Sequence, residues 1–119
     1  MTKYGFIGTG KIASSVIIGI CNSKIKYKQI LISSRNKKIA LNLKKKFKRI
    51  SISKTNQDIV DKSDWVFLSV TPTVGQKIIK DLKFRSNQKV ISFISTITLS
   101  QLKKMIKKKI DIVRAIPLP

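Results

Sequence analysis

Residues 4–13 read Tyr-Gly-Phe-Ile-Gly-Thr-Gly-Lys-Ile-Ala, a short apolar run that passes into the spacing Gly-x-Gly-x-x-Ala. An apolar helical pattern follows at once, so the glycines stand between a predicted strand and a predicted helix. This combination is typical of a dinucleotide-binding turn. Gly8 would allow the tight turn, Gly10 would let a diphosphate approach the backbone, and Ala13 would keep the helix close to the sheet.

The first turn of that helix completes the predicted phosphate site. Its N–H groups have no partner within the helix and carry a partial positive charge, which favours a bound phosphate. We therefore expect a cofactor-binding segment made of Phe6, Ile7, Gly8, Thr9, Gly10, Lys11 and Ile12.

Short β-rich runs and helical periodicity alternate along the chain. The predicted strands are Tyr4–Gly8, Gln29–Ser33, Ile50–Ser53, Trp65–Val70, Lys89–Ile94 and Asp111–Ala115. The first two predicted helices bury Ile12, Val16, Ile17 and Ile20, then Ile39, Leu43 and Phe47; the others span Gln57–Asp61, Val74–Leu82 and Leu99–Lys108, with Thr55 and Thr98 as N-caps. This order predicts an α/β, Rossmann-type doubly wound fold with a mostly parallel six-stranded sheet.

The length of 119 residues suits one domain. We assign residues 1–115 to a dinucleotide-binding domain, and residues 116–119 to the start of a linker to an absent C-terminal helical domain. No apolar run approaches the roughly 20 residues that cross a membrane, and no secretory signal is visible. Because Cys21 is the only cysteine, the chain fits a reducing compartment, and we expect a cytoplasmic protein.

The net charge of +21 invites the hypothesis of a nucleic-acid partner. Most of the excess is lysine on the polar faces or ends of predicted helices, for example at residues 44–48 and 103–109. No aromatic residues are interleaved as a stacking platform, and no known nucleic-acid-binding motif is present. We therefore favour a solvated lysine surface over a polyanion-binding one.

The second predicted strand ends in Ser33, Ser34, Arg35 and Asn36. An NAD-specific site would carry an acid here to hold both ribose hydroxyls. Two hydroxyls, a guanidinium and an amide suit a phosphate on the ribose instead, so these residues favour NADP (NADPH) over NAD. The alternative is a surface loop in which Ser34 or Asn36 caps the next helix.

Two further loops should reach the same edge of the sheet. The fourth predicted strand leads into Val70, Thr71 and Pro72, and the fifth leads into Ser95 and Thr96. Ligands of doubly wound sheets bind outside the carboxyl ends of the strands, so we expect these loops to flank the nicotinamide end of the cofactor. Ordinary turn and capping chemistry is the alternative.

Several segments together resemble the N-terminal domain of the pyrroline-5-carboxylate reductase family, over essentially the whole chain. They are Phe6–Ala13, Ser33–Asn36, Asn56, Phe67–Pro72, Val90–Ser92 and Val113–Pro117. The resemblance implies an NADP-dependent oxidoreductase of proline biosynthesis, in which NADPH delivers a hydride to a cyclic imine. It also implies that Asn56 contacts the adenosine side and that a C-terminal domain forms homo-oligomers.

Three departures from the family fall on the substrate side: Thr71 replaces a lysine, Ser95-Thr96-Ile97 replaces Ala-Gly, and Ile116-Pro117-Leu118 replaces Met-Pro-Asn. The chain has no histidine, no evident acid–base pair and no metal-ligand cluster, so the catalytic residues are unknown and no metal is expected. We expect the chain alone to turn over poorly. The alternatives are a reductase of another imine or of a deazaflavin, and a non-catalytic NADP-sensing module.

Overall fold

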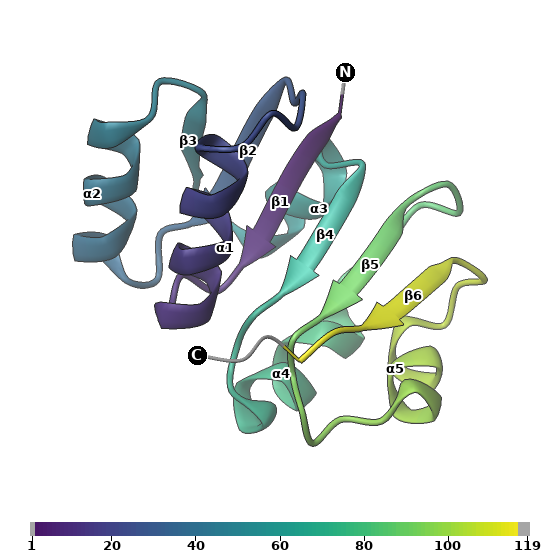
Figure 1. Ribbon diagram of the computed structural model, residues 1–119. Helices are drawn as coiled ribbons and strands as arrows, with labels where there is room; N and C mark the ends of the chain where they lie inside the picture. The colour runs from purple at the N-terminus through teal and green to yellow at the C-terminus, as the bar shows by residue number, and fades with distance from the viewer. Residues whose placement is uncertain (1, 117–119) are drawn as a thin grey trace.

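A six-stranded parallel sheet in the order β3-β2-β1-β4-β5-β6 organises residues 2–116, the part of the chain that the computed structural model describes (Figure 1). The strands are β1 (Lys3–Ile7), β2 (Gln29–Ser33), β3 (Ile50–Ser53), β4 (Trp65–Leu68), β5 (Lys89–Ser92) and β6 (Asp111–Arg114). The helices are α1 (Lys11–Cys21), α2 (Lys37–Lys46), α3 (Asn56–Lys62), α4 (Pro72–Ile78), which continues into the 3₁₀ turn η1 (Ile79–Asp81), and α5 (Leu99–Ile106). The predicted doubly wound α/β fold is confirmed.

The strand order reverses between β1 and β4. The chain first moves outward from β1 through β2 to β3, then crosses back to β4 on the other side of β1 and continues to β6. The carboxyl ends of all six strands lie at one edge of the sheet. The edge between β1 and β4 is therefore the topological switch point where doubly wound proteins bind ligands.

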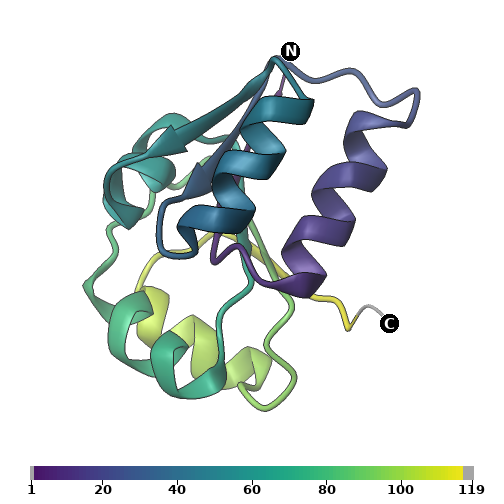
Figure 2. The same ribbon diagram turned by 90° about the vertical axis from the view of Figure 1, so that its left-hand side faces the viewer.

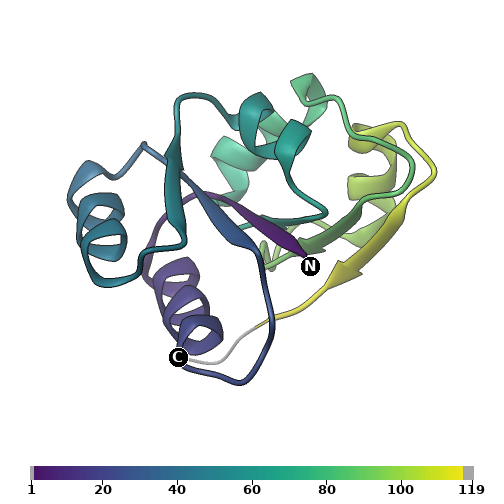
Figure 3. The same ribbon diagram turned by 90° about the horizontal axis from the view of Figure 1, so that it is seen from above.

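Alternating side chains place apolar residues on both faces of the sheet. Phe6 and its neighbours Ile17, Ile32 and Leu43 pack under α1 and α2, whereas Ile7 belongs to a second cluster under α3, α4 and α5. Figures 2 and 3 show these two helical layers on opposite sides of the sheet. The central strands are covered on both faces, which accounts for their consecutive apolar residues.

The predicted helix caps are confirmed. Thr55 Oγ1 accepts a hydrogen bond from Asp58 N at 3.1 Å at the start of α3. Thr98 and Gln101 form a reciprocal capping box on α5, with distances of 2.8 and 3.1 Å. These short polar side chains satisfy N–H groups that a helix leaves without partners.

Some predicted details differ from the structure. Ile12 is 42% exposed, because Ala13 and Ile17, four residues apart, face the sheet and turn Ile12 away from it. Strands β4 and β5 end two residues before the predicted Val70 and Ile94, since the chain turns into the loops at the sheet edge. The predicted linker falls mostly on Pro117, Leu118 and Pro119, which lie outside the described residues, so the domain boundary stays a prediction.

Candidate functional site

The glycine turn after β1 has the geometry that its sequence predicts. Gly8 has φ +97°, in the left-handed region, and a Cβ there would overlap the carbonyl oxygen of Ser69. The Ser69 N–H donates to Ile7 O at 2.8 Å, which holds the loop after β4 against the turn. The turn therefore needs glycine at this position.

Helix α1 begins at this turn without a side-chain cap. Its N-cap residue is Gly10, whereas the other four α-helices of the described chain are capped by their own side chains, those of Asn36, Thr55, Thr71 and Thr98. A Cβ at Gly10 would meet nothing within 4 Å. The first N–H groups of α1 therefore have no side-chain acceptor at the cap, and the space beside Gly10 is open.

A cleft of about 450 Å³ lies at this point of the sheet edge. It is lined by Gly8, Thr9, Gly10, Arg35, Asn36, Lys37, Ser69, Val70, Thr71 and Val74. The Thr9 side chain is 2% exposed, and its hydroxyl has no hydrogen-bond partner within residues 2–116. A buried hydroxyl without a partner costs free energy, and a ligand in the cleft would supply the missing partner.

A second hollow of about 290 Å³ adjoins the first and shares Gly8, Arg35 and Val70 with it. Its lining also contains Ile7, Ser33, Ser34, Ser53, Lys54, Thr55, Asn56 and Ile78. The two hollows together are lined by three cationic side chains and by no carboxylate. This charge distribution suits an anionic ligand with more than one phosphate group.

Most of the predicted site residues meet in these two hollows. They are Ile7, Gly8, Thr9, Gly10, Ser33, Ser34, Arg35, Asn36, Asn56, Val70 and Thr71. Lys11 and Pro72 lie at the first positions of α1 and α4 but do not line either hollow. Ser95 and Thr96 are exposed in the β5–α5 loop and also lie outside both hollows, with Ser95 O held by Arg114 Nη2 at 2.5 Å.

Phe6 cannot contact a ligand with its side chain, contrary to the expectation from the motif. It is 0% exposed and stacks on Phe67 with ring centroids 4.4 Å apart. Phe6 is therefore a core residue that lies beside the glycine turn. Ile12 lies in the first turn of α1 but lines neither hollow, so its predicted role reduces to that of its backbone N–H.

Two predicted phosphate-binding side chains are already engaged in structural hydrogen bonds. Ser33 Oγ accepts from Gly8 N at 3.3 Å, and Asn36 Oδ1 accepts from Ile39 N at 3.3 Å as the cap of α2. The capping alternative is therefore right for the oxygen of Asn36. Arg35 makes no hydrogen bond or ion pair with residues 2–116, which leaves its guanidinium available to a ligand.

The structure adds lining residues that were not among the predicted site residues. They are Lys37, Ser53, Lys54, Thr55, Ser69, Val74 and Ile78. Ser53 is the register partner of Ser33, so the end of β3 stands beside the end of β2. For Ser53, Lys54 and Thr55 the sequence signal that could have found them is this adjacency, since the turn after β3 must lie next to the turn after β2.

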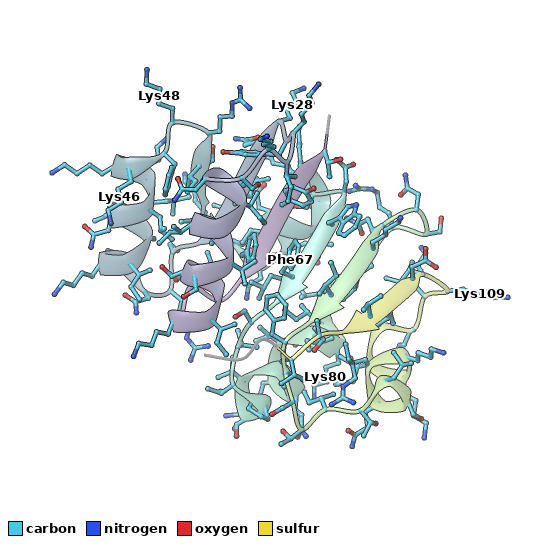
Figure 4. All side chains as sticks on the ribbon, in the orientation of Figure 1. Lys28, Lys46, Lys48, Phe67, Lys80 and Lys109 are labelled. Atoms are coloured by element: carbon cyan, nitrogen blue, oxygen red, sulfur yellow. The ribbon has the colours of Figure 1, made fainter. Side chains whose placement is uncertain are left out.

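The excess positive charge is spread around the molecule. Lys28, Lys46, Lys48 and Lys109 extend outward from different edges in Figure 4. The described chain contains a single ion pair, between Lys62 Nζ and Asp58 at 3.2 Å. In residues 2–116 no helix is long and apolar enough to span a membrane, and no group of three possible metal ligands occurs.

Fold and site together define a dinucleotide-binding α/β domain. Residues 3–97 match the family described as NADP oxidoreductase, coenzyme F420-dependent, and the chain belongs to this family. The match covers the six elements from β1 through α3 as well as β4, α4 and β5, and thus both hollows.

Relatives of known name share this domain. The chain is 29% identical over 120 residues to pyrroline-5-carboxylate reductase 3 of Danio rerio, covering 97% of this chain and 40% of that protein. It is 29% identical over 106 residues to pyrroline-5-carboxylate reductase of Arabidopsis thaliana, covering 86% and 38%. The resemblance to pyrroline-5-carboxylate reductases that the motifs indicated is confirmed, for a chain that spans about two fifths of those relatives.

Solved structures give the same result. The crystal structure of 1-pyrroline-5-carboxylate reductase from Streptococcus pyogenes superposes with a TM-score of 0.81 at 29% identity, over 98% of this chain and 42% of that one. A pyrroline-5-carboxylate reductase from Coxiella burnetii superposes with a TM-score of 0.87 over 99% of this chain and 44% of that one. At 24% identity, this second match supports the fold alone.

Proposed function

We propose that this chain is the NADP-binding part of an oxidoreductase that reduces a cyclic C=N bond, of the pyrroline-5-carboxylate reductase type. The observation that carries the proposal is the uncapped start of α1, with the unpartnered hydroxyl of Thr9 beside it, at the switch point of the sheet. The names of the two relatives favour this function over a deazaflavin reductase, and the family's description as an NADP oxidoreductase favours it over a nucleic-acid-binding protein.

The residues present fit a bound NADPH. Backbone N–H groups of Gly10 and of the first turn of α1 would receive the diphosphate, and Gly10 leaves the space that its oxygens need. Arg35 would lie against the phosphate on the adenosine ribose. Val70 and Thr71 would line the path toward the nicotinamide. When bound, the cofactor would supply a hydride to the imine carbon of the substrate.

The substrate side of the site is expected in the part of the relatives that this chain does not match, which is more than half of their length. Among the described residues, the cleft holds no acid and no histidine that could protonate an imine nitrogen. We therefore propose that the chain binds NADPH but requires further structure for turnover. Assembly into homo-oligomers through that structure, and a cytoplasmic location, belong to the same proposal.

Titration of the chain with NADPH and NADH tests the proposal. We expect NADPH to bind at least about tenfold more tightly than NADH, and Arg35→Ala to remove most of this difference. Duplex DNA at low and high salt is the control ligand, since a steep loss of DNA binding with salt marks electrostatic attraction to phosphates. DNA binding in the absence of nucleotide binding would contradict the proposal.

A second measurement concerns the reaction. Steady-state assays with NADPH and pyrroline-5-carboxylate should give little turnover with this chain alone. Turnover as fast as that of a complete reductase would show that the chain does not need a separate substrate domain.

A further inference from the structure

Lys54 occupies a position beside Arg35 that no part of the glycine-turn motif specifies. Strands β2 and β3 are paired in register at Ser33 and Ser53, so the residues that follow leave the sheet side by side. Adjacent strands are about 4.8 Å apart, which places the turn containing Lys54 next to the Ser34-Arg35 turn. The two cationic side chains therefore reach the same hollow from neighbouring loops.

Neither cation has a protein partner. Among residues 2–116, Arg35 and Lys54 make no hydrogen bond and no ion pair, and the hollow that they share contains no carboxylate. Two like charges held near one another repel unless an anion lies between them. A bound anion would therefore supply the negative charge that the lining of this hollow lacks.

Several neutral side chains around the two hollows accept hydrogen bonds from the backbone and keep their own donors. Ser33 Oγ accepts from Gly8 N, and Thr55 Oγ1 accepts from Asp58 N. Asn36, at the other end of the Arg35 turn, caps α2 with its side-chain oxygen. An anion in this hollow would therefore meet the two cationic side chains, with the side-chain donors of Ser33, Ser34 and Asn56 as further contacts.

We propose that Lys54 and Arg35 together bind the phosphate monoester on the adenosine ribose of NADPH, and that Lys54 is a specificity-determining residue for NADPH over NADH. This inference rests on the proposed function. The diphosphate belongs to the other hollow, at the start of α1, because the free N–H groups are there. A second anionic group in the Lys54 hollow then corresponds to the feature that distinguishes NADPH from NADH.

The test measures Kd values of NADPH and NADH for the 119-residue chain and for four variants. Lys54→Ala removes the charge, Lys54→Arg keeps it, and Arg35→Ala removes the neighbouring one. Lys48→Ala is the matched control, since Lys48 is an exposed lysine of the preceding α2–β3 connection and lies outside both hollows. Denaturation midpoints establish that each variant is folded.

We expect Lys54→Ala to weaken NADPH binding about tenfold and to change NADH binding less than about twofold, as loss of one charge-assisted contact predicts. Lys54→Arg should retain most of the preference, and Lys48→Ala should lower both affinities slightly and equally. The preference should shrink with added salt, because the two side chains are exposed to solvent.

Each contrary outcome has a distinct meaning. Suppose that the wild-type chain prefers NADPH, and that Lys54→Ala either leaves this preference unchanged or raises the Kd values of both nucleotides equally. The role of Lys54 is then overturned while the proposed function stands. If wild-type chain binds neither nucleotide, the proposed function fails and the inference fails with it.

Discussion

The backbone N–H of Gly8 donates a hydrogen bond to the side-chain oxygen of Ser33 at 3.3 Å, across 25 positions of the chain. This bond joins the glycine turn after β1 to the end of β2, and Ser33 is only 5% exposed. Ser33 therefore serves the position of the turn, whereas its sequence context suggested a direct contact with the ribose phosphate.

Ser33→Ala should therefore lower the stability of the fold and weaken the binding of both nucleotides. The change leaves a buried N–H without its acceptor, which costs about 1–3 kcal/mol of unfolding free energy. Because this turn is the proposed site of the diphosphate that NADPH and NADH share, both Kd values should rise by a similar factor. Urea denaturation and nucleotide titration measure the two effects. Ser92→Ala is the control, because it removes a similar buried bond, from Ile94 N at 3.1 Å, outside both hollows and should lower stability alone. A loss confined to NADPH in Ser33→Ala would instead assign Ser33 to the phosphate.

The two glycines of the turn should respond to alanine in opposite ways. Gly8→Ala meets both a left-handed φ of +97° and the carbonyl of Ser69, and should cost at least about 2 kcal/mol of stability. Gly10→Ala has an extended backbone and open space around its Cβ, and should change stability by no more than about 1 kcal/mol.

Gly10→Ala should nevertheless weaken the binding of both nucleotides. The Cβ of Gly10→Ala occupies the space proposed for the diphosphate, so NADPH and NADH should each bind at least about tenfold more weakly to a chain that is still stably folded. Denaturation curves and titrations on the same samples provide the comparison. Unchanged nucleotide affinity in Gly10→Ala would place the diphosphate elsewhere.

Local pattern and topology rules account for the part of the fold that the sequence could predict. The strands β2 and β3, and the capping of α3 and α5 by Thr55 and Thr98, follow from β-rich runs and short-range capping chemistry. Asn56, Arg35 and the glycines meet at one edge because parallel strands bring their carboxyl ends together.

Roles that depend on one specific long-range contact could not be predicted in this way. The bond from Gly8 to Ser33 and the stacking of Phe6 on Phe67 join residues far apart in the sequence. The first adds a structural role to Ser33, and the second places Phe6 in the core. Lys54 could not be predicted as a site residue for a similar reason. It belongs to no motif, and only the register of β2 and β3 brings it next to Arg35.

Thr9→Val should affect stability and nucleotide binding differently. The Thr9 hydroxyl is buried without a partner, so replacing it by a methyl group of similar shape should leave stability unchanged or raise it by about 1 kcal/mol. Nucleotide affinity should nevertheless fall about five- to tenfold, since the variant cannot hydrogen-bond the ligand.

Ser63→Ala is the matched control for that experiment. Ser63 also carries a buried hydroxyl without a partner, but it packs against Gly5 on the α3 side of the sheet and lines neither hollow. The control should alter stability in the same direction and leave both Kd values as they are. Equal nucleotide affinity in Thr9→Val and wild type would remove Thr9 from the binding site.

The pair Tyr27 and Cys21 should make stability sensitive to alkaline pH. The Tyr27 hydroxyl donates to Cys21 Sγ at 3.4 Å. This bond, burial and an electrostatic contribution from Cys21 raise the Tyr27 pKa above its ordinary value of 10.0, against a smaller lowering by Arg49. A group whose pKa is higher in the folded state stabilises the fold fully below its unfolded pKa of about 10, and this contribution is lost as pH rises through the folded value. Stability should therefore decline above about pH 10.

Cys21→Ala removes the acceptor, so it should lower the Tyr27 pKa toward its ordinary value and cost about 1 kcal/mol at neutral pH. Cys21→Ser keeps an acceptor at the same position and should retain the raised pKa. Tyrosinate absorbance during an alkaline titration reports the pKa directly, and Tyr4→Phe removes the only other tyrosine from the signal. An identical Tyr27 titration in wild type and Cys21→Ala would show that the bond to Cys21 does not set this pKa.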